Sequence, residues 1–390
     1  MKTLIELYDE RPVENVISTE VFRPEKTVFL CENTVARDKD LQNRLRQYFR
    51  KRKVKCDLQF EETAILDAGR IAETLQRVLE REPDCALDIA GGTDAALFAS
   101  GLACAKNGVP VFTYSRKRNA FYNIQNAAFA HDLKCDLRFK VEDCLLMAGG
   151  AMHRGRVDNA VLARYKKLYD PFFALYLRFR TEWVSITGYI RKISQEGLDR
   201  GDSLKAEGPI EVRGEHNSRI RANIAALEAL QEIGMIRELE TGESGVSFVF
   251  PDEQIRAWLR DVGSVLELYI YQCCLDTGLF SDVRTSVVVD WHGDGRPDAV
   301  TNEIDVMATA GITPVFISCK TCDVKTEALN ELAILRERFG SGIAKAVIVT
   351  SGTRGRNVMR NRAAELGIDV IALEDLKNGE VRKKLASYAG

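Results

Sequence analysis

The segment from Asn302 to Lys320 carries charged side chains within two short apolar runs, NEIDVMAT and VFISCK. These runs read as neighbouring strands joined by a tight turn between Thr309 and Pro314. Asp305 interrupts the first strand and Lys320 ends the second. A carboxylate and an amine side by side on adjacent strands can position a metal ion and a water for hydrolysis of a phosphodiester. The alternative is an ordinary hairpin with two surface charges.

The sequence around this hairpin alternates between helical and strand patterns. In chain order, we expect helix 264–280, strand 286–291, the two hairpin strands, helix 325–340, strand 345–352, helix 354–367 and strand 368–373. Such alternation predicts an α/β domain over residues 261–390.

The order of helix, three strands, helix and strand resembles the restriction-endonuclease-like core. In that core, an acid at the start of the second strand and an acid-x-lysine pair on the third surround one or two metal ions. Asp305 and Lys320 match these positions, but Ser318 stands where the core usually has the second acid. A hydroxyl is a poorer ligand than a carboxylate for a hard divalent cation. Ligand charge must therefore come from elsewhere.

Two other acids could supply that charge. Glu267 lies on the helical segment before the strands, where its neighbours are apolar, and members of the resembled core often use an acid from that helix. Glu303 lies two residues before Asp305, so both side chains project from the same face of a strand. The alternatives are a solvent-facing glutamate and a charge on an edge strand. The backbone carbonyl of Cys319 is a further candidate ligand.

These groups define a chemistry. Asp305 and Glu267 would hold Mg²⁺ or Mn²⁺ and leave water in the open positions. The metal would lower the pKa of one water and polarise the phosphate. Lys320 would orient that water or neutralise the charge that develops on the phosphoryl group.

Residues 27–145 show a second alternation of strands and amphipathic helices. The predicted elements are strand 27–33, helix 38–53, strand 54–60, helix 68–81, strand 85–93, helix 95–108 and strand 109–115. This spacing predicts a parallel, doubly wound sheet. Such sheets bind ligands at the carboxyl ends of their strands.

Three of these strands end in polar residues. Gly91, Gly92, Thr93 and Asp94 lie between a strand and a helix start, where glycines and helix amides allow an anion to approach the backbone. The other two ends are Glu32-Asn33-Thr34 and Tyr114-Ser115. Together they indicate a site for a polar, phosphate-bearing ligand. The alternative for the GGT loop alone is a tight turn, and the loop matches neither GxGxxG nor a Walker sequence.

Residues 146–260 have a different character. Glycine-rich and aromatic segments come first, and a helix ending at Gly234, a short hairpin over 240–252 and a helix over 253–263 follow. This order suggests a winged-helix-like module. The wing carries few basic residues, which phosphate contact normally needs. A linker or dimerisation element is therefore favoured over a DNA reader.

Composition limits the class of protein. The 390 residues have a formal net charge of −2, so nucleic-acid binding would depend on local clusters. Residues 44–55 hold seven basic residues and 354–362 hold four, and each cluster is either a polyphosphate-facing surface or a solvated helix face. Ten irregularly spaced cysteines, with no expected signal peptide or membrane span, favour a reducing cytoplasm.

Two other groups resemble metal sites. Asp290, His292, Asp294 and Asp298 crowd one loop, but Asp294-Gly295 reads as a hairpin turn. An acidic turn is therefore favoured over a second cation site. The CxxC formed by Cys319 and Cys322 has no second pair at a spacing suited to zinc.

The two motifs together resemble a known family. An amino-terminal Asp88-Ile-Ala-Gly-Gly-Thr-Asp94 loop on a Rossmann-like sheet, followed by NEIDV and ISCK, is similar to CRISPR-associated CARF effectors with a PD-(D/E)XK nuclease. The resemblance covers the whole chain. It implies a CARF domain over 1–145, a linker with a winged-helix-like module over 146–260 and a nuclease domain over 261–390.

The resemblance also implies a function. A homodimer would bind a cyclic oligoadenylate, most often cyclic tetra-adenylate, made by a type III CRISPR complex during antiviral defence. The nuclease would then cut single-stranded RNA and DNA or nick DNA. An alternative is a nucleotide-sensing transcriptional regulator with a structural carboxyl-terminal domain, and degradation of the ring by the first domain also stays open.

Overall fold

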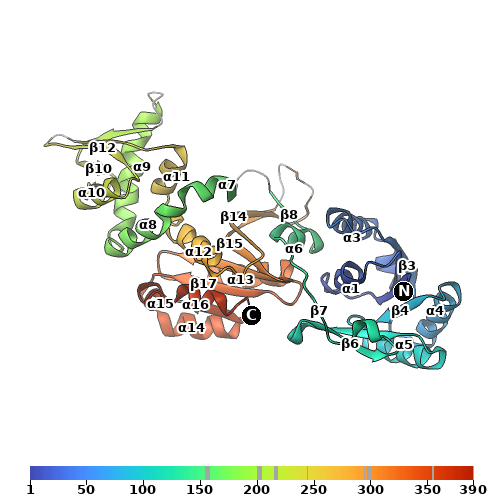
Figure 1. The fold of residues 1–390 in the computed structure, drawn as a ribbon. Coiled ribbons are helices and arrows are strands. Elements are labelled where there is room, and N and C mark those ends of the chain that lie inside the picture. The colour runs from blue at the N-terminus through green and yellow to red at the C-terminus, as the bar shows by residue number, and fades with distance from the viewer. Residues whose placement is uncertain are drawn as a thin grey trace.

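The chain forms three bodies in a row in the computed structural model (Figure 1). The amino-terminal sheet domain lies at one end, a helical module at the other, and the carboxyl-terminal sheet domain between them. The structure describes residues 1–153, 159–199, 204–214, 218–243, 245–293, 295–296, 300–353 and 355–389. Within these residues no helix is long and apolar enough to cross a membrane.

The amino-terminal domain contains the predicted parallel sheet. Its seven strands lie in the order β3-β2-β1-β4-β5-β6-β7. The strands are β1 (Thr3–Leu7), β2 (Lys26–Cys31), β3 (Asp57–Glu62), β4 (Cys85–Asp88), β5 (Val111–Ser115), β6 (Ala120–Gln125) and β7 (Leu133–Lys134). The first five are mutually parallel, β6 is antiparallel to β5, and β7 is antiparallel to β6.

The central strand β1 was not predicted, because the alternation seemed to begin at residue 27. Its sequence TLIEL is short and has a carboxylate in the middle, which is unusual for a strand buried on both faces. The Glu6 carboxylate is nevertheless buried and accepts a hydrogen bond from the Thr19 hydroxyl. The buried Glu6 is therefore the reason why the central strand was not recognised from the sequence.

Helices cover both faces of this sheet, as expected of a doubly wound fold (Figure 1). They are α1 (Glu14–Phe22), α2 (Asn33–Arg37), α3 (Lys39–Lys51), α4 (Ala68–Arg81) and α5 (Asp94–Asn107). Asp38, Asp67 and Thr93 cap α3, α4 and α5 with side-chain oxygens that accept from first-turn amides. These caps fix where each helix leaves its strand.

The middle module contains the predicted helix, two-stranded wing and helix. Its helices are α7 (Asn159–Leu162), α8 (Lys166–Arg178), α9 (Trp183–Asp199), α10 (Ile224–Glu232) and α11 (Glu253–Arg260). Its strands are β9 (Lys205–Gly208), β10 (Glu211–Arg213), β11 (Arg219–Arg221), β12 (Arg237–Thr241) and β13 (Val246–Val249). The wing gains a third strand, β9, from a stretch expected to be loose, because only Ala206 of KAEG is buried and the pattern is polar.

The carboxyl-terminal domain has the predicted order of elements. Its sheet runs β18-β17-β16-β15-β14-β8. The elements are α12 (Ser264–Thr277), β14 (Asp282–Asp290), β15 (Thr301–Ala310), β16 (Thr313–Lys320), α13 (Thr326–Phe339), β17 (Lys345–Thr350), α14 (Arg356–Glu365), β18 (Ile368–Ile371), α15 (Leu373–Lys377) and α16 (Val381–Ala386). The hairpin turn consists of Gly311 and Ile312, and Gly311 has the positive φ that such turns require.

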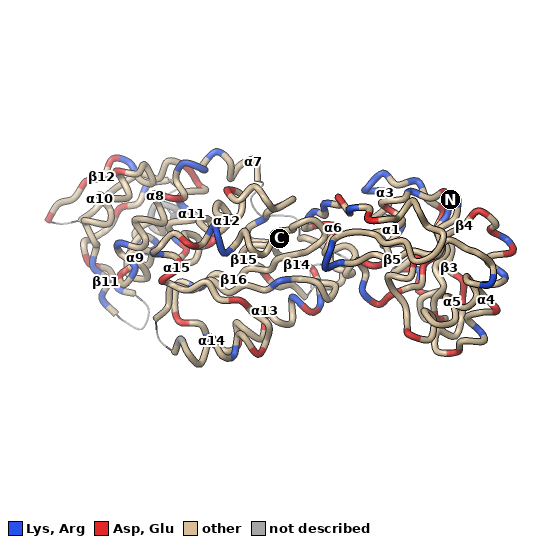
Figure 2. The backbone as a smooth tube through the Cα atoms, turned by 60° about the horizontal axis from the view of Figure 1, so that its bottom comes forward, with Lys and Arg blue, Asp and Glu red and all other residues tan. Residues whose placement is uncertain are grey.

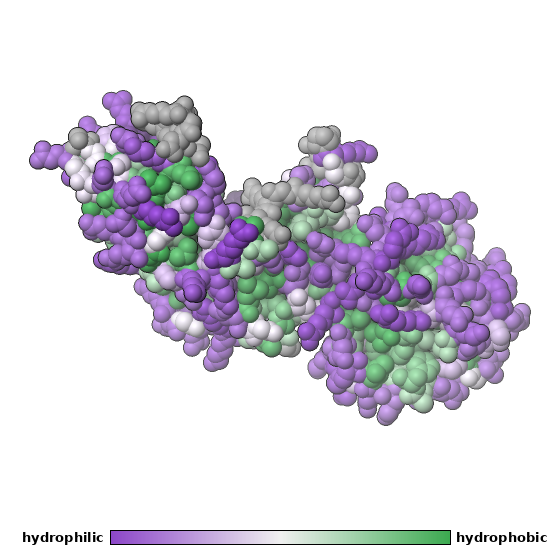
Figure 3. Space-filling view, turned by 45° about the horizontal axis from the view of Figure 1, so that its top comes forward, coloured by the Kyte–Doolittle hydropathy of each residue, from purple (hydrophilic) through white to green (hydrophobic). Residues whose placement is uncertain are grey.

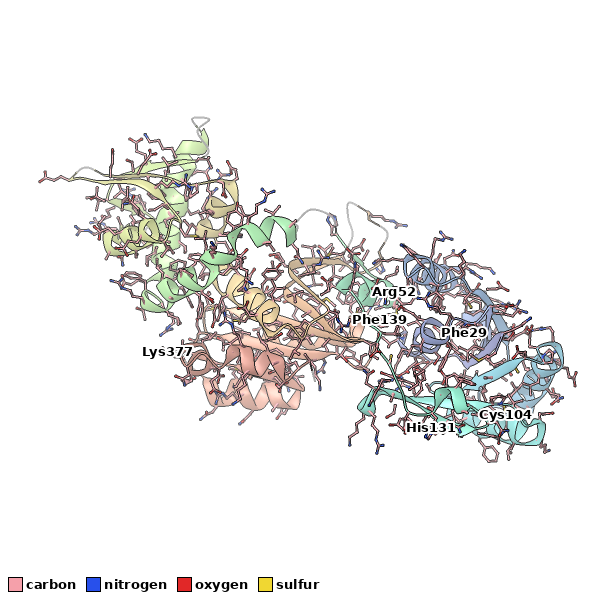
Figure 4. All side chains as sticks on the ribbon, viewed as in Figure 1. Phe29, Arg52, Cys104, His131, Phe139 and Lys377 are labelled. Atoms are coloured by element: carbon pink, nitrogen blue, oxygen red, sulfur yellow. The ribbon has the colours of Figure 1, made fainter. Side chains whose placement is uncertain are left out.

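The segment between the two sheets joins them. After α6 (Val141–Met147), strand β8 (Ala151–Met152) pairs with β14 and becomes the edge of the carboxyl-terminal sheet. The Phe139 amide donates to the Gly311 carbonyl, and the Phe139 carbonyl accepts from the Thr309 hydroxyl. Figure 4 places Phe139 and Arg52 at this junction.

A charged network holds α6 against the amino-terminal domain. The buried Asp143 carboxylate contacts Lys51 at 3.0 Å and Arg52 at 3.5 Å. Arg52 also contacts Glu20 of α1 at 2.7 Å. One arginine thus ties α1, α3 and α6 together, and α6 leads directly into the other sheet.

Asp143→Ala tests this network. Arg52 would keep Glu20 but lose its second carboxylate, so the free energy of unfolding should fall by about 2 kcal/mol. Glu142→Ala is the control, because Glu142 is an exposed partner of Lys51 and its loss should cost about 0.5 kcal/mol or less. Equal effects in urea unfolding would contradict the assigned role of Asp143.

Candidate active site

Asp305 lies where strands β15 and β16 run side by side. Its Oδ2 accepts three hydrogen bonds, from the Ser318 hydroxyl at 3.1 Å, the Cys319 amide at 2.6 Å and the Lys320 ammonium at 3.1 Å. The hairpin register brings these donors beside Asp305, since Val306 pairs with Ile317. The structure therefore brings the predicted carboxylate and lysine into direct contact.

The charge on Lys320 is maintained by this contact. Burial disfavours the ammonium form, but the Asp305 carboxylate outweighs burial, and the pKa of Lys320 is raised above its usual value. Lys320 is about one third exposed, so the ammonium borders the open space in front of the sheet. It can reach a reacting group there without leaving the strand.

That open space is a cavity of about 710 Å³ between α11, α12 and the sheet. Its charged lining residues are Asp261, Glu267, Glu303, Asp305, Lys320 and Glu331. Five carboxylates and one lysine thus face a single cavity. Such a concentration of oxygen ligands suits a hard divalent cation.

Glu267 projects from the first turn of α12 toward this cavity. Burial, followed by the charges of Asp305, Asp261 and Glu303, raises the pKa of Glu267 to about 8. Gly263 precedes the helix and leaves room, since a Cβ there would lie 2.8 Å from Glu267 Oε1. Glu267 is therefore neither solvent-facing nor remote from Asp305.

The other two candidate ligands differ from one another. Glu303 lines the same cavity as Asp305, as the two-residue spacing predicts. Cys319 is buried, and burial raises the pKa of its thiol well above the usual value. The side chain of Cys319 thus packs in the core, and only its backbone carbonyl is left as a candidate.

Two acids of the cavity were missed from the sequence. Asp261 precedes α12 and accepts from the amide and the hydroxyl of Ser264, the first residue of that helix. The D-x-x-S pattern before an apolar helix was the available signal. Glu331 lies on α13 and accepts a hydrogen bond from the Asn302 side-chain amide. The sequence gave no sign of its role, because a polar residue on an exposed helix face is ordinary.

The donor set fits a divalent cation by its chemistry. The acids are close enough for their charges to raise the pKa of Glu267, and a bound cation would relieve that repulsion. Among the described residues, no three of the His, Cys, Asp and Glu side chains already converge at ligand distance. Binding would therefore draw the carboxylates together.

The described residues of the acidic loop after β14 wrap around the Asp290 carboxylate. The Asp290 carboxylate accepts from the amides of His292, Gly293 and Gly295 at 2.8–3.0 Å. Burial opposes ionisation, but these amides outweigh it and lower the pKa of Asp290. Asp294 and Asp298 lie outside the described residues.

The strand ends of the amino-terminal sheet form a second cavity, of about 940 Å³. Three predicted residues, Glu32, Asn33 and Thr34, line it together with Arg70 and Arg77 of α4. The lining thus combines two arginines, which can bind phosphates, with three carboxylates, those of Glu32, Glu62 and Glu73.

The GGT loop lies beside this cavity. Thr93 caps α5 and donates from Oγ1 to the Ile65 carbonyl at 2.6 Å, which joins the loop to the segment before α4. Gly92 has φ +92°, and a Cβ there would lie 2.6 Å from the Leu7 Cβ. Asp94 is exposed at the first position of α5.

The end of β1 supplies residues that were missed with that strand. Asp9 accepts from the Gly92 amide at 3.2 Å and holds Arg11 at 2.8 Å. By contrast, Tyr114 is buried and its hydroxyl donates to the Asn119 side chain. The Tyr114 ring thus packs in the core and does not line the strand-end cavity. Ser115 beside it is half-buried at the end of β5.

The pKa of Glu267 leads to a prediction about stability. Between the ordinary value of 4.5 and the folded value of about 8, the folded protein keeps a proton that the unfolded chain has released. Stability should therefore fall as pH rises from about 5 to about 8, with a contribution of up to about 1.4 kcal/mol per pH unit.

Urea unfolding with a chelator present checks this dependence. Glu267→Gln should flatten the pH profile over that window, and Glu327→Gln, an exposed change on α13, should leave it unchanged. A Glu267→Gln profile parallel to that of the wild type would contradict the assigned protonation.

Comparison with known proteins supports the fold and the carboxyl-terminal domain. Residues 253–389 match the family model of the Card1-like endonuclease domain. Protein VC1899 from Vibrio cholerae has a TM-score of 0.75 and 18% identity, with 99% of this chain and 97% of that chain covered. A search of curated proteins finds no match.

A second solved structure is that of Can2 from Sulfobacillus thermosulfidooxidans in complex with cyclic tetra-adenylate. Its TM-score is 0.70 at 16% identity, and 100% of this chain and 99% of that chain are covered. At such identities the likeness shows a shared fold. The predicted resemblance is thus confirmed for a Card1-like endonuclease domain over residues 253–389 and for the fold of Can2 along the whole chain.

Proposed function

We propose that this chain is a metal-dependent nuclease that cyclic tetra-adenylate activates in type III CRISPR antiviral defence. The observation that carries the proposal is the contact between Asp305 and Lys320 in an acidic cavity of a Card1-like endonuclease domain. A cavity at the strand ends of the other sheet, with Arg70 and Arg77 in its lining, supports a nucleotide activator. Can2, which shares the fold, was solved with cyclic tetra-adenylate.

Four groups would hold Mn²⁺ or Mg²⁺ in the acidic cavity. Asp305 and Glu267 are the principal ligands in this proposal, and Glu303 and the Cys319 carbonyl complete the set. When bound, the ion would polarise the scissile phosphate and lower the pKa of a water. With no acid at Ser318, the extra carboxylates of the cavity compensate for the missing charge.

Lys320 then has a defined task. Its ammonium lies 3.1 Å from Asp305 at the edge of the cavity, where it can orient the attacking water or neutralise charge on the phosphoryl group. A compact charge on a flexible stem suits either task. Single-stranded RNA and DNA are the proposed substrates.

The activator would bind at the strand ends. The amides of Gly91 and the first turn of α5 would present donors to a phosphate, and the Gly92 amide would do so in exchange for Asp9. Glu32, Asn33 and Thr34 offer polar groups to the rest of the nucleotide. Tyr114 takes no part through its side chain.

A second copy of the chain is the proposed partner. Figure 3 shows hydrophobic surface gathered on the amino-terminal domain. On α5, the helix that follows the GGT loop, Phe98 is 65% exposed and Leu102 is 54% exposed. Their four-residue spacing places both on one helix face, which a homodimer would cover. Ten free thiols fit the proposed cytoplasmic location.

The segment after β1 also lies close to the nuclease domain. Arg11, held by Asp9 at the end of β1, lies against Gly342 after α13, where a Cβ would be 3.6 Å from the Arg11 Cδ. An anion bound near Gly92 would compete with Asp9 for nearby donors and alter this contact. A coupling of about 1–3 kcal/mol is enough for a ligand-dependent change in activity.

Asp305→Ala and Lys320→Ala should each lower the rate of cleavage of labelled single-stranded RNA, in Mn²⁺ and cyclic tetra-adenylate, by at least about a thousandfold. Binding of the ring, measured by calorimetry, should stay within about twofold. Glu327→Gln serves as a control for a charge change on the same domain. Undiminished cutting by both alanine variants would remove these residues from the active site.

Gly92→Ala should weaken ring binding by about tenfold or more. The substitution forces a side chain into a positive φ and against Leu7, so the loop must move away from its anion-ready shape. Gly242→Ala is a matched control, since a Cβ there meets nothing within 4 Å. If both variants bind the ring as the wild type does, the GGT loop is not part of the nucleotide site.

A further inference from the structure

A basic groove lies at the end of α3, away from both cavities described above. It has a volume of about 520 Å³ and lies between the last turns of α3 and the start of β3. Its charged lining residues are Arg46, Arg50, Lys53, Lys55 and Asp57. Four cations thus face one carboxylate in a protein whose net charge is −2.

The six cations of residues 46–55 divide into two sets with different surroundings. Lys51 and Arg52 turn toward α6 and Glu20, where they form the ion pairs of the domain junction. Within the described residues, no ion pair engages the four groove cations, and Arg46 instead lies over the Phe60 ring at 5.8 Å. Figure 2 shows the basic segments along α3. The groove set is therefore not needed for the junction.

The backbone at Lys53 gives an independent sign. α3 ends with the Val54 amide bonded to the Phe49 carbonyl and the Lys53 amide bonded to the Arg50 carbonyl. This is the Schellman arrangement, and the residue in its left-handed position is usually glycine. Here Lys53 has φ +56°, a conformation that a side chain makes unfavourable. Lys53 thus occupies a backbone position at which glycine would cost less conformational free energy.

We propose that this groove binds the phosphodiester backbone of a single-stranded nucleic acid. Lysine and arginine contact phosphates without reading sequence, and a stripe of them can hold a strand along its length. Arg46 on an aromatic ring adds a surface on which a base can stack. The inference rests on the proposed function only for the identity of the nucleic acid, which would be of the single-stranded class that the nuclease cuts.

The groove is separate from the proposed activator site. It meets β3 at Asp57 and Leu58, the first residues of the strand, whereas the strand-end cavity meets Glu62 and Thr63 at the other end. The two sites thus occupy opposite ends of one edge strand. A strand held at the groove would leave the nucleotide cavity free.

Binding of a fluorescein-labelled single-stranded RNA, followed by anisotropy over a range of salt, tests the proposal. The measurement uses Lys320→Ala protein with EDTA and without cyclic tetra-adenylate, so it does not depend on cleavage or activation. The groove variant is Arg50→Gln/Lys53→Gly/Lys55→Gln. The charge-matched control is Lys345→Gln/Lys377→Gln/Lys383→Gln, and Figure 4 labels Lys377 far from α3.

The groove variant should bind at least about tenfold more weakly, and its slope of log affinity against log salt should fall by about 2. The control should stay within about twofold of the parent. Lys53→Gly alone should weaken binding by about threefold while the melting temperature is unchanged or higher, since glycine suits the left-handed position. A structural role would instead lower the melting temperature.

Two results would overturn the proposal. One is an equal loss of affinity in the groove variant and the control, which would show a general effect of net charge. The other is displacement of the RNA from the parent protein by polyglutamate as effectively as by polyphosphate. That result would assign the groove to an acidic polypeptide.

Discussion

The repulsion among carboxylates around Asp305 is the constraint on which the active-site account depends. Three donors from one strand hold the Asp305 oxygen, and burial, followed by the charges of the neighbouring acids, raises the pKa of Glu267 to about 8. Such an arrangement costs folding free energy unless a proton or a cation compensates. Lys320 compensates part of the charge, and a divalent metal would compensate the rest. The crowding of carboxylates that lowers the stability of the fold would thus also supply the ligands for metal-assisted hydrolysis.

The second feature is the continuity between the two sheets. α6 is held to the amino-terminal domain by Asp143 and leads into β8, which is the edge strand of the nuclease sheet. On the other side, Arg11 at the strand-end site lies against Gly342. A change at the nucleotide site therefore has two physical routes to the nuclease. Linkage requires only that the activator bind the two arrangements of these contacts with different affinity.

The sequence predicted the residues whose types break a local pattern. Asp305 and Lys320 were found because charges stand out in apolar strands, and Glu267 because it interrupts an apolar helix.

β1 was missed because its buried Glu6 made a central strand look amphipathic, and Asp9 and Arg11 were missed with it. Glu331 reaches the cavity from another element, and Tyr114 turns into the core. Whether such a residue reaches the cavity or the core depends on the direction of its side chain and on contacts between distant segments. Periodicity along the chain reports neither.

The proposed activity is that of a nuclease whose cutting depends on a nucleotide. The most direct test is the rate of cleavage of labelled single-stranded RNA in Mn²⁺, with and without cyclic tetra-adenylate, for the wild type and Lys320→Ala. Rapid cutting by the wild type only when the ring and the metal are both present, and none by Lys320→Ala, is the predicted result. Equal cutting with and without the ring, or cutting that survives in Lys320→Ala, would contradict the account.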